Sequence, residues 1–131
     1  MKHILLVDDD EDDRDFFRSV LTSIESSLVY QAAENGQDAL QKLNSGIPLP
    51  DLIFLDLNMP VMGGKQFLAE VKKRSHLKDI PIVILSTSSD KATISDTIDL
   101  GAVEFLTKPN KLSLLEGRLR EILNNPTYHR K

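Results

Sequence analysis

Four short apolar runs constrain the fold of this chain more than any other feature of its sequence. They are Ile4–Val7, Leu52–Leu55, Ile82–Leu85 and Val103–Leu106. Each run is nearly continuous and is bounded by polar or turn residues, which is typical of strands buried on both faces of a parallel sheet. A weaker run, Leu28–Ala33, predicts a further strand nearer to an edge of the sheet.

Amphipathic helical patterns lie between and after these runs, with apolar residues at helical spacing. The positions are Phe17, Val20, Leu21 and Ile24; Ala39, Leu40 and Leu43; Phe67, Leu68 and Val71; Ile94 and Ile98; and Leu112, Leu115, Leu119 and Ile122. Glycine is a favoured helix terminator, so we expect the second helix to end at Gly46 and the fourth near Gly101. This alternation of strand and helix, five times over, predicts an α/β fold with a doubly wound parallel sheet.

Size and composition fit one domain and exclude several classes of protein. The chain has 131 residues, of which 40% are apolar and 27% charged, and these values are ordinary for a globular protein. It has no cysteine, which excludes disulfides, thiolate metal sites and cysteine nucleophiles. Its net charge of −4 argues against a general affinity for nucleic acid. The first apolar run is too short for a signal peptide or a membrane span, so we expect a soluble cytoplasmic protein.

Polar side chains follow the carboxyl ends of four predicted strands. In an open parallel sheet, ligands bind beyond these ends. The first strand is followed by Asp8-Asp9-Asp10, the third by Asp56, the fourth by Ser86 and the fifth by Lys108. Carboxylates that meet in one cleft repel each other unless a cation joins them, and hard oxygen ligands suit Mg²⁺. One carboxylate beside that ion could attack phosphorus, while the ammonium and the hydroxyl contact the phosphoryl oxygens.

Taken singly, these residues also have structural interpretations. Glu11, Asp12 and Asp13 open a helix, where acidic residues favour the positive end of its dipole, so we expect them to be solvated first-turn residues. Asp56 alone could cap a helix, and a lone serine or lysine at a strand end is common. The joint placement at four strand ends favours the functional interpretation.

The chain resembles the receiver domain of two-component response regulators from Ile4 to about Leu123. The resemblance is carried by ILLVDDD at 4–10, DLIFLDLNMPVMGG at 51–64, PIVILSTS at 81–88 and GAVEFLTKP at 101–109. It implies a flavodoxin-like (βα)5 fold whose five-stranded parallel sheet has the order 2-1-3-4-5. We therefore predict a receiver domain at 1–125 and a short C-terminal tail at 126–131.

The resemblance also implies a phosphoacceptor and a metal site. Asp56 matches the residue that takes the phosphoryl group. Asp9 looks like a direct ligand of Mg²⁺, Asp8 like a ligand acting mainly through metal-bound water, and the backbone carbonyl of Asn58 like a third protein ligand. Asp56 itself would complete the site, and Mn²⁺ or Ca²⁺ could replace Mg²⁺. Such a domain is a signalling phosphoacceptor, with metal-dependent self-phosphorylation and slow self-dephosphorylation, rather than an enzyme.

A switch is implied as well. Ser86 matches the hydroxyl that bonds the phosphoryl group, Lys108 the lysine that pairs with it, and Phe105 the aromatic switch that turns inward. Phenylalanine has no hydroxyl to satisfy when buried, so we expect a higher basal activity than with tyrosine. Thr87 stands where a small alanine is frequent, and its bulk is expected to narrow access to the phosphoryl group.

Asn58 and Ser88 lie two residues beyond the acceptor and the switch hydroxyl, where the family tunes dephosphorylation. The implied phosphodonor is a sensor histidine kinase or a histidine phosphotransfer protein. The sequence shows no output domain, so we expect output through a downstream protein target or onward phosphotransfer. No nucleic-acid or membrane partner is expected. The state is predicted to be a monomer or a weak homodimer through helix 4, strand 5 and helix 5.

Two other interpretations remain open at this point. A haloacid-dehalogenase-like phosphatase carries its nucleophile on the first strand with a second acid two residues later, which Asp8 and Asp10 could mimic. The usual cap insertion and downstream acidic motif are not visible. A degenerate receiver would bind partners without phosphorylation, but such domains typically lack the acceptor or an acidic-pair residue. Turnover of a generic phosphate ester identifies the first, and absence of Mg²⁺-dependent labelling by a small phosphodonor identifies the second.

Overall fold

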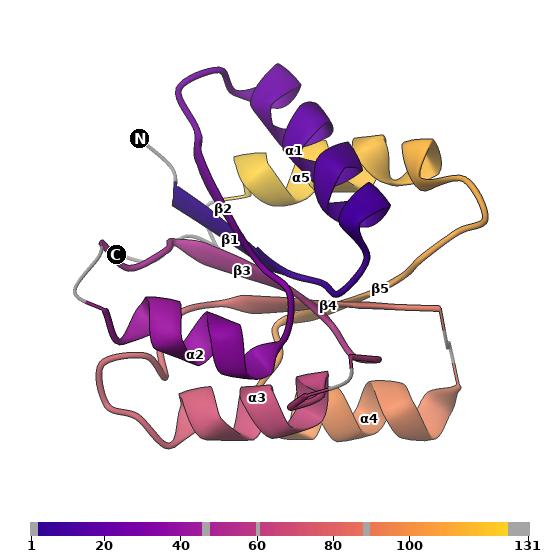
Figure 1. The fold of residues 1–131 in the computed structure, drawn as a ribbon. Coiled ribbons are helices and arrows are strands. Elements are labelled where there is room, and N and C mark those ends of the chain that lie inside the picture. The colour runs from indigo at the N-terminus through magenta and orange to yellow at the C-terminus, as the bar shows by residue number, and fades with distance from the viewer. Residues whose placement is uncertain (1–2, 46–47, 60, 88–89, 126–131) are drawn as a thin grey trace.

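Five parallel strands form one sheet in the order β2-β1-β3-β4-β5, as predicted (Figure 1). The computed structural model describes residues 3–45, 48–59, 61–87 and 90–125. The strands are β1 (His3–Val7), β2 (Val29–Ala33), β3 (Leu52–Asp56), β4 (Ile82–Ser86) and β5 (Glu104–Thr107). The chain winds first toward β2 and then back across β1 to β3, so the reversal of strand order falls between the carboxyl ends of β1 and β3.

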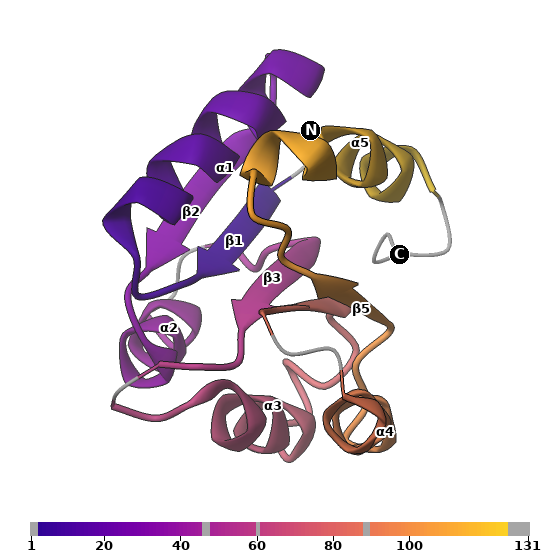
Figure 2. The same cartoon turned by 90° about the vertical axis from the view of Figure 1, so that its right-hand side faces the viewer.

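Helices cover both faces of the sheet. The two views show α1 and α5 on one face and α2, α3 and α4 on the other (Figures 1 and 2). The helices are α1 (Glu11–Ile24), α2 (Gly36–Leu43), α3 (Gly64–Lys72), α4 (Lys91–Asp99) and α5 (Glu116–Asn124). Within the described ranges, no helix combines the length and the apolar character that a bilayer crossing requires.

The sheet divides the apolar core into two clusters. On the α2–α3 side, Leu5 of β1 belongs to the same cluster as Phe67 of α3, and on the α1–α5 side Leu6 belongs with Phe17 of α1. Every residue of β1, β3 and β4 is buried, as expected for strands covered on both faces.

The fifth strand differs from the prediction of a strand buried on both faces. It begins one residue later than the predicted run, and the first residue of that run, Val103, is 41% exposed. Phe105 is only partly buried. The reason is that β5 lies at the edge of the sheet and pairs only with β4. The other edge strand is β2, as its weaker apolar run indicated.

The helices differ from the predictions at α2, which ends earlier than expected, and at α5. The predicted fifth helix is divided into a 3₁₀ turn, η1 (Leu112–Leu115), and α5, a tightening that is common at helix N-termini. The fourth helix stops next to Gly101, whose φ of 110° favours glycine. The second helix ends at Leu43, and the predicted terminator Gly46 lies outside the described residues, as does the predicted tail at 126–131.

The start of α3 lies against the end of β3 so closely that a side chain does not fit. A Cβ atom at Gly64 would lie 2.7 Å from the carbonyl oxygen of Asp56 and 2.7 Å from the Cα of Leu57. Both are backbone atoms, so Gly64→Ala is expected to destabilise the fold by about 2–3 kcal/mol, measured by urea unfolding. Gly117, the second residue of α5, gives the control Gly117→Ala, since nothing lies within 4 Å of a Cβ there. This change should stabilise the fold by less than about 1 kcal/mol. Equal effects of the two changes would contradict the argument.

Candidate functional site

The register of the sheet places the predicted site residues together at the carboxyl ends of the strands. Asp56 is the last residue of β3 and pairs with Leu85, which directly precedes Ser86 at the end of β4. Lys108 follows β5, and its backbone N–H donates to the carbonyl of Ser86 at 2.7 Å. Asp8 follows β1, the strand next to β3. The structure thus brings together the strand ends that the sequence singled out.

Three carboxylates converge at these strand ends. Oxygens of Asp8, Asp9 and Asp56 all lie within 4.8 Å of one another. Asp8 and Asp56 are buried, with 0% and 5% of their surface exposed, whereas Asp9 is exposed. Hard oxygen donors at this spacing, with one side open to solvent, have the chemistry that a divalent cation such as Mg²⁺ prefers.

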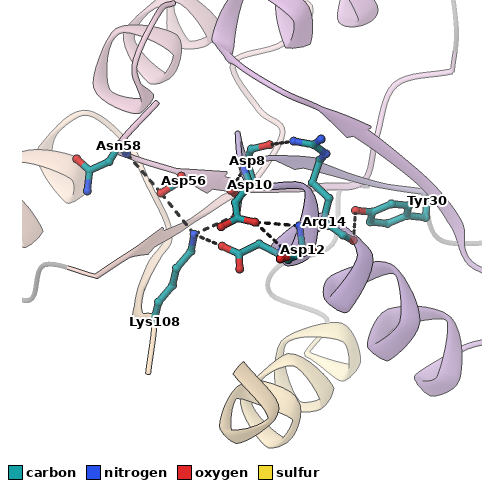
Figure 3. Close-up of polar contacts among 9 residues, drawn as sticks. Asp8, Asp10, Asp12, Arg14, Tyr30, Asp56, Asn58 and Lys108 are labelled. Atoms are coloured by element: carbon teal, nitrogen blue, oxygen red, sulfur yellow. Dashed lines mark hydrogen bonds and ion pairs between the residues drawn. The ribbon is translucent and has the colours of Figure 1, made fainter. Parts of the chain in front are cut away.

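Lys108 brings a positive charge into this cluster (Figure 3). Its ammonium Nζ lies 3.0 Å from Asp8 Oδ2, 2.9 Å from Asp13 Oδ2 and 3.6 Å from Asp56 Oδ1. Only 8% of the Lys108 side chain is exposed, so these are buried ion pairs rather than surface contacts. The interpretation of this lysine as a surface residue is excluded for the described structure.

Asp13 corrects the prediction that it is merely a solvated residue of the first helical turn. It does lie in the first turn of α1, but its carboxylate accepts a hydrogen bond from Lys108 and its side chain is 18% exposed. Glu11 and Asp12 are exposed, as expected. No local pattern separated Asp13 from Asp12, because its partner lies 95 residues away along the chain.

In this site the single ammonium of Lys108 faces three carboxylates, and the pKa values of the buried groups are shifted as a result of burial and of these charges. Burial raises the pKa of Asp56 to about 7, with the negative charge of Asp8 adding to the rise, although the Lys108 ammonium and the Asn58 N–H act against it. Burial also raises the pKa of Asp8. For Lys108, burial by itself lowers the pKa, but the hydrogen bond that it donates to Asp13 and the charges of Asp56 and Asp8 outweigh this effect, so the pKa is raised. One buried ammonium therefore does not neutralise the carboxylates around it.

A chain of hydrogen bonds that sequence reasoning missed supports the acidic loop after β1. The Arg14 guanidinium donates to the backbone carbonyl of Asp8 at 2.7 Å (Figure 3). The Tyr30 hydroxyl of β2 donates in turn to the carbonyl of Arg14 at 3.0 Å. Burial raises the pKa of Tyr30 to about 12, so its hydroxyl stays protonated and able to donate at neutral pH. These contacts fix the position of the loop that carries Asp8 and Asp9.

Asp10 has a structural role rather than a chemical one. Its carboxylate caps α1, accepting from the backbone N–H of Asp12 at 2.9 Å and of Asp13 at 3.3 Å. A phosphatase of the haloacid-dehalogenase type would need this acid beside the nucleophile on the first strand. The geometry therefore does not favour that interpretation.

A pocket of about 480 Å³ lies at the carboxyl ends of β3 and β4. Ser86 is fully buried and lines it, together with Asn58 and residues at the starts of α3 and α4. Thr87 is exposed. Phe105 is partly buried and contacts the core cluster on the α2–α3 side. Ser88 lies outside the described residues.

Comparison with known proteins identifies the family. The model of the response regulator receiver domain matches residues 4–120. The chain is 37% identical over 132 residues to the two-component response regulator ARR17 of Arabidopsis thaliana, covering 93% of this chain and 85% of that protein. It is also 32% identical over 106 residues to the sensor histidine kinase CheAY of Helicobacter pylori, covering 81% of this chain but only 13% of the kinase. Similar domains thus also occur within longer proteins.

Solved structures of response regulators are similar to this chain in both fold and sequence. The phosphorylated cyanobacterial phytochrome response regulator RcpA has a TM-score of 0.86 and 33% identity, covering 92% of this chain and 90% of that chain. The Mn²⁺-bound form of the response regulator Rcp1 has a TM-score of 0.85 and 32% identity, covering 93% and 91%. The sheet order, the strand-end carboxylates and these matches lead to one conclusion. The chain belongs to the response regulator receiver domain family of two-component signal transduction.

Proposed function

We propose that Asp56 accepts a phosphoryl group in a two-component phosphorelay. In this step a carboxylate oxygen of Asp56 forms a bond to phosphorus, and the bond from phosphorus to the donor breaks, with its electron pair leaving on the donor. The observation that carries the proposal is the meeting of Asp8, Asp9 and Asp56 within 4.8 Å, with Lys108 beside them. Similarity to RcpA, which was solved in a phosphorylated form, supports it.

The same residues fit a divalent cation. Asp8, Asp9 and Asp56, with the backbone carbonyl of Asn58, would hold Mg²⁺, and Mn²⁺ or Ca²⁺ could replace it. Burial and the negative charge of Asp8 raise the pKa of Asp56, and this supports the assignment, as does the Mn²⁺-bound form of Rcp1. When bound, the ion would neutralise charge on the phosphoryl oxygens.

The remaining site residues have distinct proposed roles. Lys108 would pair with a phosphoryl oxygen, since its ammonium is already 3.6 Å from Asp56 Oδ1. Ser86 would bond another phosphoryl oxygen from the end of β4. Phe105 lies on the neighbouring strand and is only partly buried. Its ring would turn inward as the loop after Ser86 shifts toward the phosphoryl group. Residues 1–125 would form this receiver unit.

The partners follow from the chemistry. The donor would be a sensor histidine kinase or a histidine phosphotransfer protein, and the output would be contact with a downstream protein. The proposed contact surface is the face formed by α4, β5 and α5. The protein would be a monomer or would form a weak homodimer through this face. Exposed apolar side chains on it support this assignment: Ile98 is 44% exposed, Val103 41% and Leu114, just before α5, 70%.

Intact-mass measurement with acetyl phosphate and Mg²⁺ tests the proposal. The wild type is expected to gain the mass of one phosphoryl group, and EDTA should prevent the gain because the carboxylates then lack their counter-ion. Asp56→Asn should show no gain, since an amide is not a nucleophile toward phosphorus. An unlabelled wild type would favour a phosphorylation-independent binding module, and labelling that persists in Asp56→Asn would move the acceptor elsewhere.

A further inference from the structure

The ion pair between Asp13 and Lys108 is the shortest of the three that the lysine makes with carboxylates. The distance is 2.9 Å, against 3.0 Å to Asp8 and 3.6 Å to Asp56. Asp13 is nevertheless not part of the group of carboxylates that could hold a cation. Among the described residues, it is therefore a partner of the lysine that stands apart from the metal site.

The geometry indicates what this partner does. An ammonium has three N–H donors, and two of those of Lys108 are used at hydrogen-bond distance by Asp8 and Asp13. The 3.6 Å separation from Asp56 Oδ1 is too long for a hydrogen bond. A cation at the carboxylate group would compete with Lys108 for Asp8 but not for Asp13. Asp13 would then hold the ammonium by itself.

We infer that Asp13 is a positioning residue that retains the Lys108 ammonium beside α1 and so opposes its pairing with a phosphoryl group on Asp56. The inference rests on the function proposed above. Loss of the Asp13 carboxylate frees the ammonium and removes a negative charge near the incoming phosphoryl group. Both changes act in the same direction, and phosphorylation becomes more favourable.

Asp12 is the matched control for this role. Both residues lie in the first turn of α1, carry the same charge and donate their backbone N–H to Asp10. Successive residues on a helix point about 100° apart at 3.6 residues per turn. Asp12 is accordingly exposed, while Asp13 reaches Lys108. A change at Asp12 reports the loss of one acidic charge and of its interaction with the helix dipole, without loss of the ion pair.

The test measures the acetyl phosphate concentration that gives half-maximal labelling in Mg²⁺. Asp13→Ala is expected to lower this concentration about fivefold, the effect of losing one ion pair worth about 1 kcal/mol. Asp12→Ala should stay within about twofold of the wild type. Equal values for the two variants, or a higher concentration for Asp13→Ala, would overturn the inference. If the wild type itself is not labelled, the proposed function fails and this inference fails with it.

A double-mutant cycle shows whether Asp13 acts through the lysine. In a Lys108→Met background, Asp13→Ala should no longer change the half-maximal concentration. A shift as large as that in the wild-type background would assign the effect to the general field of the carboxylate and contradict the inference. If Lys108→Met is too weakly labelled, the urea midpoints at pH 8 in EDTA decide instead. Asp13→Ala should move the midpoint in the wild-type background and not in the Lys108→Met background, and equal shifts would again contradict it.

Discussion

Asp56→Asn is expected to raise the free energy of unfolding of the metal-free protein at pH 8, in addition to the loss of labelling predicted above. Burial and the charge of Asp8 raise the pKa of Asp56 to about 7, so the folded state resists its ionisation. The rise in this pKa from its ordinary value near 3.8 to about 7 corresponds to a gain on the order of 2–4 kcal/mol in unfolding free energy for the neutral amide. The site therefore costs stability in the absence of a cation.

The pH dependence of this gain follows from the direction of the shift. An acid whose pKa is raised on folding destabilises the folded state as it ionises. The penalty is absent below the unfolded pKa near 3.8, grows as the pH rises, and is complete above about 7. The difference between Asp56→Asn and wild type should therefore be small at pH 4 and largest at pH 8, measured by urea unfolding in EDTA.

A control and a metal titration make the measurement specific. Asp15→Asn removes the same charge from an exposed position on α1 and should change stability by no more than about 0.5 kcal/mol. Mg²⁺ should stabilise the wild type more than Asp56→Asn, because binding to the folded state adds stability and the variant lacks one of the proposed ligands. A gain of equal size at pH 4 and pH 8 would show that the effect comes from packing or hydrogen bonding rather than from charge.

Lys108→Met should have the opposite effect. The substitution keeps most of the apolar stem but removes the ammonium that pairs with Asp8, Asp13 and Asp56. Loss of one partner leaves buried carboxylates without their counter-charge, so we expect the free energy of unfolding to fall by about 3 kcal/mol at pH 8 in EDTA. The loss should shrink at pH 5, because Asp8 and Asp56, whose pKa values Lys108 holds down, then take up protons instead.

The comparison with a surface lysine isolates the contribution of burial. Lys65 pairs with Asp96 at 3.1 Å, but both side chains are about half exposed, at 47% and 57%. Lys65→Met should therefore cost less than about 1 kcal/mol. The double variant Lys108→Met/Asp56→Asn should lose less unfolding free energy than the sum of the two single effects predicts, since the amide no longer needs the Lys108 ammonium. Similar losses for Lys65→Met and Lys108→Met would contradict the buried-pair argument.

Much of the fold could be predicted from the sequence because parallel strands buried on both faces leave continuous apolar runs. The runs at β1, β3 and β4 and the helical spacing between them were sufficient to place these elements. The burial of β5 was predicted wrongly, since a run of apolar residues does not reveal whether a strand has one neighbour or two. The strand order came from the family resemblance rather than from periodicity.

The sequence by itself determined which strand ends carry the charged and hydroxyl side chains of the candidate site, because the carboxyl ends of parallel strands lie on the same side of such a sheet wherever it forms. It could not determine the distances between side chains there. Lys108 lies 100 residues from Asp8 and 95 from Asp13, and only the docking of α1 and β5 onto the same sheet brings the three together. The tertiary structure also decided the support of Asp8 by Arg14 and the raised pKa of Asp56. Both depend on burial and on contacts through space, which local spacing along a chain does not encode.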